Sequence, residues 1–344
     1  MDIAYLLFLQ RIRGAVSPFW ERFFNAVSVW DLSIYAVLLI PCLLYWCVDK
    51  RRGQLVLFSY VGARFFNAVL KLTFCCYRPW IRDARVIPSP LALGGAGGYS
   101  FPSGHASSGV GLFASAGWAY RRSFFGIVTA LLWLFVLLVM FSRNFLGVHT
   151  PQDVLVGASV GILAIYLSER FLDWIDQNGA KDFLVLLLAA ASCAATLGYF
   201  MMKPYPVDYV DGRLLVDPLR MQLSSFKQLG ELAGLFLGWF IERRWIRFST
   251  VCSVPEKLVR FLLCAVGLIW VNRHVPPLLN AVLGVRGAVI MNRFVFIFYI
   301  VCVAPFFCRL LHGIFGRVLL SCKKLEILHN YSPNDLQIDK NALL

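Results

Sequence analysis

Long apolar runs constrain this chain more than any other feature of its sequence. A transmembrane helix needs roughly 20 mostly apolar residues, and the 344-residue chain offers several runs of this kind. Of its residues, 59% are hydrophobic and only 15% are charged, whereas about 25% are charged in an ordinary soluble domain. The sequence therefore predicts an all-α fold, a polytopic transmembrane helical bundle.

Nine apolar segments are predicted to cross the membrane: residues 30–48, 54–75, 104–120, 124–141, 152–170, 182–201, 228–242, 257–272 and 293–312. Before them, residues 1–29 are expected to form an amphipathic interfacial helix, with a break or a new start at Pro18. Residues 275–291 are too short and too interrupted for a span, so we expect a re-entrant or surface helix there.

A polar loop at residues 203–227, rich in proline and charge, divides the chain. It separates a predicted core, residues 30–175, from a predicted C-terminal transmembrane extension, residues 176–320. The polar residues 321–344 are predicted to be a cytoplasmic tail.

The basic residues form short clusters between the apolar runs, although the net charge of +14 could otherwise indicate a nucleic-acid partner. If the nine spans alternate, the clusters at 49–52, 121–122, 243–247 and 309–324 all lie on one side, which is predicted to be cytoplasmic. We therefore expect membrane lipids as partners and no nucleic acid. The ten cysteines include no CxxC pair and no metal-binding spacing, so we expect free thiols, no metal and no cofactor.

Two cations mark the outer end of the second predicted span. Lys71 and Arg78 are seven residues apart, about two helical turns, so both side chains can point the same way. Taken separately, each cation could simply extend its charged group to the membrane interface, which is known as snorkelling. Cations at membrane depth are nevertheless typical of functional sites.

A second polar stretch, Pro102-Ser103-Gly104-His105, opens the third span. Ser103 is a good N-cap, and the unpaired N–H groups at a helix start attract anions. Gly104 allows a ligand to approach the backbone closely. A plain helix start that happens to carry a histidine is the alternative interpretation.

The third stretch, 142-SRNFLGVHTPQD-153, joins the fourth and fifth spans. Asp153 is favoured near a helix start for its charge alone. It also follows His149 by four residues, within range to accept the ring N–H and fix the tautomer. Arg143 adds a third cation, with a fork suited to phosphate oxygens. Because all three stretches map to the outer ends of adjacent spans, together they predict an anion pocket.

The three stretches resemble the signature of the type 2 phosphatidic acid phosphatases, which share a superfamily with glucose-6-phosphatase and the vanadium haloperoxidases. The pattern Lys71-x6-Arg78-Pro79, then Pro102-Ser103-Gly104-His105, then Ser142-Arg143-x5-His149-x3-Asp153 matches it at every position. The resemblance covers about residues 30–175 and implies a six-helix phosphatase core. The C-terminal extension is similar to one found in some bacterial relatives, and no catalytic residue is assigned to it.

The resemblance implies metal-independent hydrolysis of a phosphomonoester or pyrophosphate. His149 is then the nucleophile that forms a phosphohistidine, Asp153 supports it, and His105 is the general acid and base. Lys71, Arg78 and Arg143 hold the phosphoryl oxygens, together with the Ser103 hydroxyl and the Gly104 N–H.

A site at the membrane surface favours a lipid phosphate, in the bacterial cytoplasmic membrane and on its extracytoplasmic face. Undecaprenyl diphosphate, phosphatidylglycerol phosphate, phosphatidic acid and phosphosphingoid bases all remain candidates. Three alternatives use the same pocket: a lipid phosphotransferase, a transporter or scramblase with a headgroup-binding cation cluster, and a vanadate-dependent peroxidase.

Overall fold

The computed structural model of the chain describes residues 2–30, 38–121, 126–210 and 212–330. It is almost entirely helical, which confirms the predicted all-α polytopic fold. The α-helices are α1 (Asp2–Ala15), α2 (Pro18–Trp30), α4 (Lys50–Phe74), α5 (Pro79–Arg82), α6 (Pro90–Leu93), α7 (Gly104–Gly109), α8 (Ser115–Ala119), α9 (Gly126–Phe145), α10 (Pro151–Gln177), α11 (Asp182–Met202), α12 (Pro218–Ile241), α13 (Val254–Val282), α14 (Val285–Phe298) and α15 (Ala304–Asn330).

Short irregular elements interrupt or join these helices. The π-helical turns are η1 (Leu38–Cys42), η2 (Leu44–Val48), η3 (Val110–Ala114), η5 (Glu242–Ile246) and η6 (Tyr299–Val303), and η4 (Gly179–Lys181) is a 3-10 turn. Strands β1 (Tyr209–Val210) and β2 (Arg213–Leu214) form a small antiparallel hairpin, in the loop that the sequence marks as a division.

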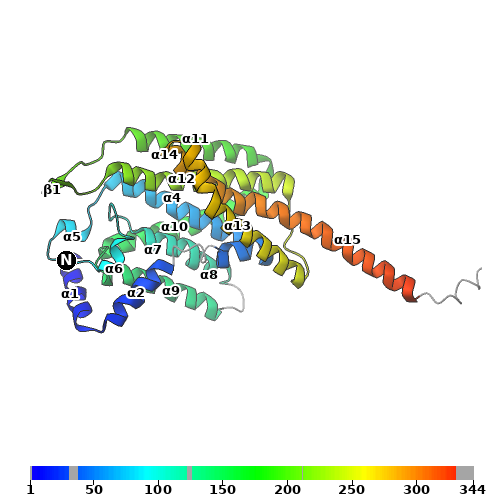
Figure 1. The fold of residues 1–344 in the computed structure, drawn as a ribbon, viewed down its shortest axis with the longest axis horizontal. Coiled ribbons are helices and arrows are strands. Elements are labelled where there is room, and N and C mark those ends of the chain that lie inside the picture. The colour runs from blue at the N-terminus through cyan, green and yellow to red at the C-terminus, as the bar shows by residue number, and fades with distance from the viewer. Residues whose placement is uncertain (1, 31–37, 122–125, 211, 331–344) are drawn as a thin grey trace, which may run out of the picture.

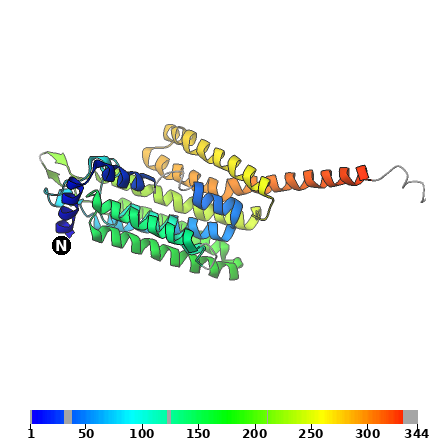
Figure 2. The same cartoon turned by 90° about the horizontal axis from the view of Figure 1, so that it is seen from below.

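The long helices run side by side as an elongated bundle (Figures 1 and 2). Helices α1, α2, α5 and α6 and the hairpin gather at one end of it, and α15 extends beyond the opposite end. Among the described residues, five helical segments are long and apolar enough to cross a membrane, against the nine spans predicted: Lys50–Arg82, Gly126–Phe145, Pro151–Gln177, Gly179–Met202 and Val285–Arg317.

Two predicted segments differ in detail from the structure. The third predicted span is a composite of α7, η3 and α8, with its π-helical turn packed against α4. Residues 275–291 do not form a separate surface helix, because α13 continues through Pro276 and Pro277 to Val282 and α14 begins at Val285. Packing of α13 against α14 outweighs the loss of two backbone donors. Part of the first predicted span, residues 31–37, lies outside the described residues.

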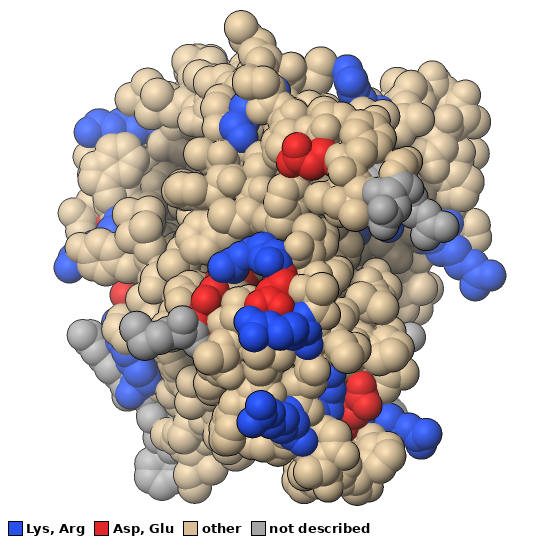
Figure 3. Space-filling model, turned by 90° about the vertical axis from the view of Figure 1, so that its left-hand side faces the viewer, with Lys and Arg blue, Asp and Glu red and all other residues tan. Residues whose placement is uncertain are grey.

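The basic clusters at the other end of the bundle are paired with acidic residues from neighbouring helices. Arg51 at the start of α4 bonds Asp173 on α10 at 2.5 Å. Arg243 on η5 bonds Asp176 at 2.8 Å and Asp182 at 3.1 Å. These pairs hold the loops of both halves of the chain together at one end of the bundle. The end that carries the helix α1 shows intermingled positive and negative side chains (Figure 3).

Glycines allow the backbones of α12 and α14 to approach closely. A Cβ atom on Gly230 would lie 2.0 Å from the carbonyl oxygen of Ile290, and one on Gly234 would lie 2.5 Å from that of Phe294. Real Cβ contacts are never this short, so both positions exclude larger side chains. Small residues at such crossings are typical of helix packing in membranes. This contact fixes α12 against the rest of the extension.

We expect Gly230→Ala to lower the thermal unfolding midpoint of the detergent-solubilised protein by several degrees. Forcing a methyl group into a packed contact costs about 1–3 kcal/mol, and each kcal/mol shifts the midpoint by about 2–4 °C in a domain of 150–250 residues. Gly198→Ala on α11 is the matched control, because a Cβ there meets open space. Equal midpoints for the two variants would contradict the close packing of α12 on α14.

Candidate active site

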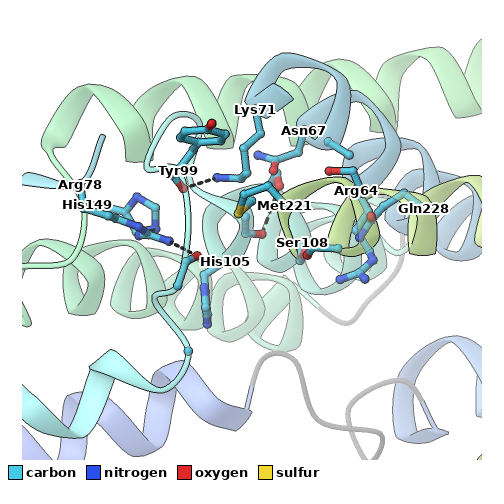
Figure 4. A pocket seen from close by; sticks show the side chains of 17 residues that line it. Arg64, Asn67, Lys71, Arg78, Tyr99, His105, Ser108, His149, Met221 and Gln228 are labelled. Atoms are coloured by element: carbon cyan, nitrogen blue, oxygen red, sulfur yellow. Dashed lines mark hydrogen bonds between the residues drawn. The ribbon is translucent and has the colours of Figure 1, made fainter. Parts of the chain in front are cut away.

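The site forms where three helix ends meet at the end of the bundle that carries α1. Helix α4 ends there at Phe74, α7 begins there at Gly104, and the connection between α9 and α10, residues 146–150, crosses the same end. Because neighbouring helices alternate in direction, all three signature stretches come to one level. The structure brings Lys71, Arg78, Gly104, His105 and His149 around a single cavity of about 170 Å³ (Figure 4).

His149 is buried and contacts charged groups through both ring nitrogens. Its Nδ1 lies 3.5 Å from Asp153 Oδ2, and its Nε2 lies 2.8 Å from Arg78 Nη1. A guanidinium can only donate, so Nε2 is the acceptor and the ring proton is assigned to Nδ1, facing the carboxylate. The spacing of His149 and Asp153 in the sequence therefore does produce the predicted pair.

Asp153 is held by two further donors. Its Oδ2 accepts hydrogen bonds from the Thr150 backbone N–H at 2.8 Å and from Ser100 Oγ at 2.6 Å. Thr150 caps helix α10 and accepts in turn from the Asp153 N–H, so the two residues form a capping box. Asp153 is thus both a helix-capping residue and the partner of His149, which are the two interpretations that its position allows.

Ser100 was not predicted from the sequence. It is buried, and its hydroxyl lies 3.4 Å from His149 Nδ1 while it donates to Asp153. No local pattern marks it, because it lies in the loop before the signature stretch that opens α7. Its contacts with His149 and Asp153 form only when the loop folds against α10.

Backbone carbonyl groups position Arg78 and Lys71. Arg78 donates to the Val148 carbonyl at 2.8 Å and to the Gly98 carbonyl at 3.1 Å. Lys71 Nζ donates to the carbonyls of Pro102 at 2.7 Å and Tyr99 at 3.1 Å. Both cations therefore bind the loop before α7 and are fixed before any ligand arrives. Neither snorkels away from the bundle.

Ser103, Gly104 and His105 start helix α7 as predicted. The Ser103 hydroxyl caps the helix by accepting from the Ala106 N–H, and its own N–H donates to the Asp153 carbonyl at 2.8 Å. Gly104 and His105 line the cavity. Ser103 is fully buried behind them, so in this structure its hydroxyl serves the helix start.

Arg143 lies behind the cavity and is not among the residues that line it. Its side chain is buried and donates to the Ser28 hydroxyl on α2, while its carbonyl accepts from the His149 N–H at 3.3 Å. The expected direct role of Arg143 in phosphate binding stays a prediction. Its position places a positive charge close to His149.

Burial lowers the pKa of His149 well below the usual histidine value, and the nearby charges of Arg78, Arg143 and Lys71 lower it further. The imidazole is therefore neutral at physiological pH. A neutral ring with its proton on Nδ1 presents the Nε2 lone pair to the cavity side. This is the protonation state that a nitrogen nucleophile needs.

Helix α12 supplies a wall of the cavity that the sequence did not predict. Met221, Ser224, Ser225 and Gln228 on this helix line the cavity together with the signature residues, and Figure 4 shows Met221 and Gln228 beside it. They belong to the C-terminal extension, to which no catalytic residue was assigned from the sequence. No motif marks them, because their contribution depends on the long-range packing of α12 against α4.

A bundle of apolar helices that holds fixed cations and a carboxylate-paired histidine at one end is the arrangement expected of a membrane phosphatase. Comparison with known proteins agrees: residues 53–176 match the PAP2 superfamily. The matched segment is similar to the type 2 phosphatidic acid phosphatases. The chain is a membrane lipid phosphatase, and its reaction class is phosphoric monoester hydrolysis.

Two relatives share about half of the chain. A lipid A 4'-phosphatase of Porphyromonas gingivalis is 26% identical over 169 residues, which cover 47% of this chain and 70% of the relative. A lipid A 4'-phosphatase of Bacteroides thetaiotaomicron is 28% identical over 169 residues, which cover 47% of this chain and 72% of the relative. No solved structure matches the chain.

We expect Ser100→Ala to lower kcat about tenfold or more while the protein stays folded. A hydrogen bond to a charged group contributes about 1.5–3 kcal/mol, and Ser100 acts on Asp153, which in turn orients His149. Phosphate release from a lipid phosphate in detergent measures kcat and KM. Ser159→Ala is the matched control, because this exposed serine on α10 bonds only its own helix. A change in KM alone would contradict the positioning role.

Proposed function

We propose that the chain hydrolyses a phosphate ester on the headgroup of a membrane lipid, through a phosphohistidine formed on His149 and at the extracytoplasmic face. The observation that carries the proposal is the placement of His149 at the cavity, between Arg78 on Nε2 and Asp153 on Nδ1. One ring nitrogen is thus aimed at a cation site where a phosphoryl group would bind. The other is tied to a carboxylate.

In the first step, a phosphoryl oxygen takes the place of His149 as partner of the Arg78 guanidinium. The freed Nε2 lone pair then attacks phosphorus, and the bond to the lipid oxygen breaks. The ring becomes a cation as the N–P bond forms, and the carboxylate of Asp153 stabilises that charge through Nδ1–H. His105, which takes up a proton when the phosphate anion binds beside it, donates that proton to the leaving lipid oxygen.

In the second step, water attacks the phosphohistidine. His105, now neutral, accepts a proton from this water, and the N–P bond breaks to release inorganic phosphate. His105 lines the same cavity as His149 and is partly accessible from it, which supports a role on the side of the leaving group. Both histidines return to their starting states.

Charge stabilisation comes from cations that are already in place. Lys71 and Arg78 line the cavity, and Gly104 exposes the start of helix α7 to it. Phosphoryl transfer depends mainly on positioning and electrostatic stabilisation, and donors fixed by backbone carbonyls need no reorganisation during the reaction. We therefore propose that the residues of the chain stabilise the transferred group without a metal ion.

The sidedness of the site rests on the charge pattern. Lys50, Arg51, Arg121 and Arg243 all belong to the bundle end opposite the cavity, where they pair with acidic residues of α10, α11 and η5. Basic loops favour the cytoplasmic side. The cavity then faces the extracytoplasmic side of the bacterial cytoplasmic membrane.

The substrate class follows from the relatives and from the depth of the cavity. Both relatives are lipid A 4'-phosphatases, which favours a phosphorylated glycolipid over the other candidates. Undecaprenyl diphosphate, phosphatidylglycerol phosphate, phosphatidic acid and a phosphosphingoid base remain to be compared with it. All five present a phosphate at the headgroup level.

A phosphate-release panel over these lipids tests the proposed function. We expect the wild-type protein in detergent to release inorganic phosphate in EDTA, with lipid A 4'-phosphate among the best substrates. His149→Ala should lose at least about a thousandfold in kcat, because removing a nucleophile leaves only binding and electrostatic effects. Release without an added acceptor separates hydrolysis from phosphotransfer.

Three outcomes would contradict this proposal. Activity that disappears in EDTA and returns with a divalent metal would exclude the metal-independent reaction. Full phosphate release by His149→Ala, in protein that elutes as a single species from a sizing column, would exclude His149 as the nucleophile. Lipid transport that survives His149→Ala, in a wild type that releases no phosphate, would favour the transporter or scramblase interpretation.

A further inference from the structure

The cavity has a second half that lies deeper in the bundle than His149. Arg64 lines it and precedes Lys71 by seven residues on α4, which corresponds to about 10 Å along a helix. Ser108 lines it from α7 and Gln228 from α12. In Figure 4 Arg78 and His149 lie at one side of the cavity and Arg64 and Gln228 at the other, with Met221 between them. The deep half is therefore the part of the cavity that lies beyond the phosphate-binding cations proposed above.

The deep half is polar, but its charges are compensated. Arg64 forms a two-pronged ion pair with Glu231 on α12, at 2.8 and 3.1 Å, and Glu231 is buried. Its other polar lining residues include Ser108, Ser224, Ser225 and Gln228, none of which carries a charge. Uncharged donors and acceptors suit hydroxyl and amide groups, whereas a second phosphate requires excess positive charge. The two halves of the cavity thus differ in the chemistry they can bind.

Gln228 is held in place by its neighbours. With its amide oriented to satisfy them, its oxygen accepts from Arg64 Nη2 at 3.1 Å and its nitrogen donates to the Ser224 carbonyl at 2.7 Å. The Arg64–Glu231 pair and Gln228 therefore form one network across the contact of α4 with α12. A prearranged network loses little conformational freedom when a ligand binds.

An apolar cavity of about 410 Å³ continues the same helix faces further into the bundle. On α4 it is lined by Phe65, three residues before Ala68 of the polar cavity. On α12 it is lined by Leu232 and Leu235, four and seven residues after Gln228. These spacings keep one face of each helix. The succession of cationic, neutral polar and apolar surfaces is the order of phosphate, backbone and chain in a phospholipid or glycolipid.

We propose that α12 and the Arg64 network form a selectivity subsite for the uncharged polar group that links the phosphate of the substrate to its acyl chains. This inference rests on the proposed function and specifies its substrate class: a lipid phosphate with hydroxyl or amide groups next to the phosphate, such as a phosphorylated sugar or glycerol. Helix α12 lies outside residues 53–176, which match the superfamily. The extension thereby selects the substrate for a reaction that the core carries out.

Two single-chain lipids of similar length test this proposal. Palmitoyl lysophosphatidate carries a glycerol hydroxyl and an ester next to its phosphate, and hexadecyl phosphate carries neither. We expect the wild-type protein to favour lysophosphatidate at least about tenfold in kcat/KM, since losing a partner for buried polar groups costs at least that much. Gln228→Leu should lower kcat/KM about tenfold on lysophosphatidate and less than about threefold on hexadecyl phosphate.

Ser224→Ala changes an exposed hydroxyl, so it tests the same selectivity with little risk to folding. It should lower kcat/KM about threefold on lysophosphatidate only. Leu219→Ala is the matched control on α12, because Leu219 is exposed and lies outside the cavity. Equal losses on both lipids in Gln228→Leu and none in Ser224→Ala, or a wild type without preference, would overturn the subsite. Failure of the wild type to release phosphate from these lipids and from every lipid of the panel above would overturn the proposed function itself, whereas hydrolysis of panel lipids without hydrolysis of lysophosphatidate would overturn the subsite alone.

Discussion

The contact of His149 with two opposite charges is the interaction on which the rest of the site depends. Asp153 on one ring nitrogen fixes the tautomer, and Arg78 on the other keeps the ring from accepting a proton there. Burial and the neighbouring cations keep the pKa of His149 low. A buried imidazole in this setting is neutral and held in one orientation. Its Nε2 lone pair becomes available when an anion replaces the ring as the partner of the guanidinium. The surrounding loops hold the side chains of His149, Asp153 and Arg78 at fixed distances.

Helix ends supply that rigidity. Asp153 belongs to the capping box of α10, Ser103 caps α7, and Ser103 N–H bonds the carbonyl of Asp153. Catalytic geometry is therefore linked to backbone hydrogen bonds that each helix needs in any case. A membrane bundle favours this arrangement, since unsatisfied backbone groups at helix ends are expensive near lipid. Pre-formed charge at the ends of packed helices also explains how phosphate can be bound without large rearrangement.

The sequence predicted most of the helical fold and the parts of the site that are local. Lys71, Arg78, His105 and His149 lie near helix ends that hydropathy locates, so their convergence on one cavity could be foreseen. Ser100 could not, because loop residues acquire partners only after tertiary packing. The α12 wall and the Arg64–Glu231 pair were missed for the same reason, since their partners are separated by 167 residues. The continuation of α13 through two prolines shows packing outweighing local propensity.

The central claim is that phosphate passes through His149, and trapping the covalent intermediate tests it most directly. Protein mixed with a lipid substrate labelled with radioactive phosphate and quenched with denaturant should carry label that is stable in alkali and lost in mild acid, as a phosphohistidine is. The label should map to the peptide containing residues 144–153 and be absent from His149→Ala. Label that survives acid, or that persists in His149→Ala, would show that another residue accepts the phosphate and would contradict the account.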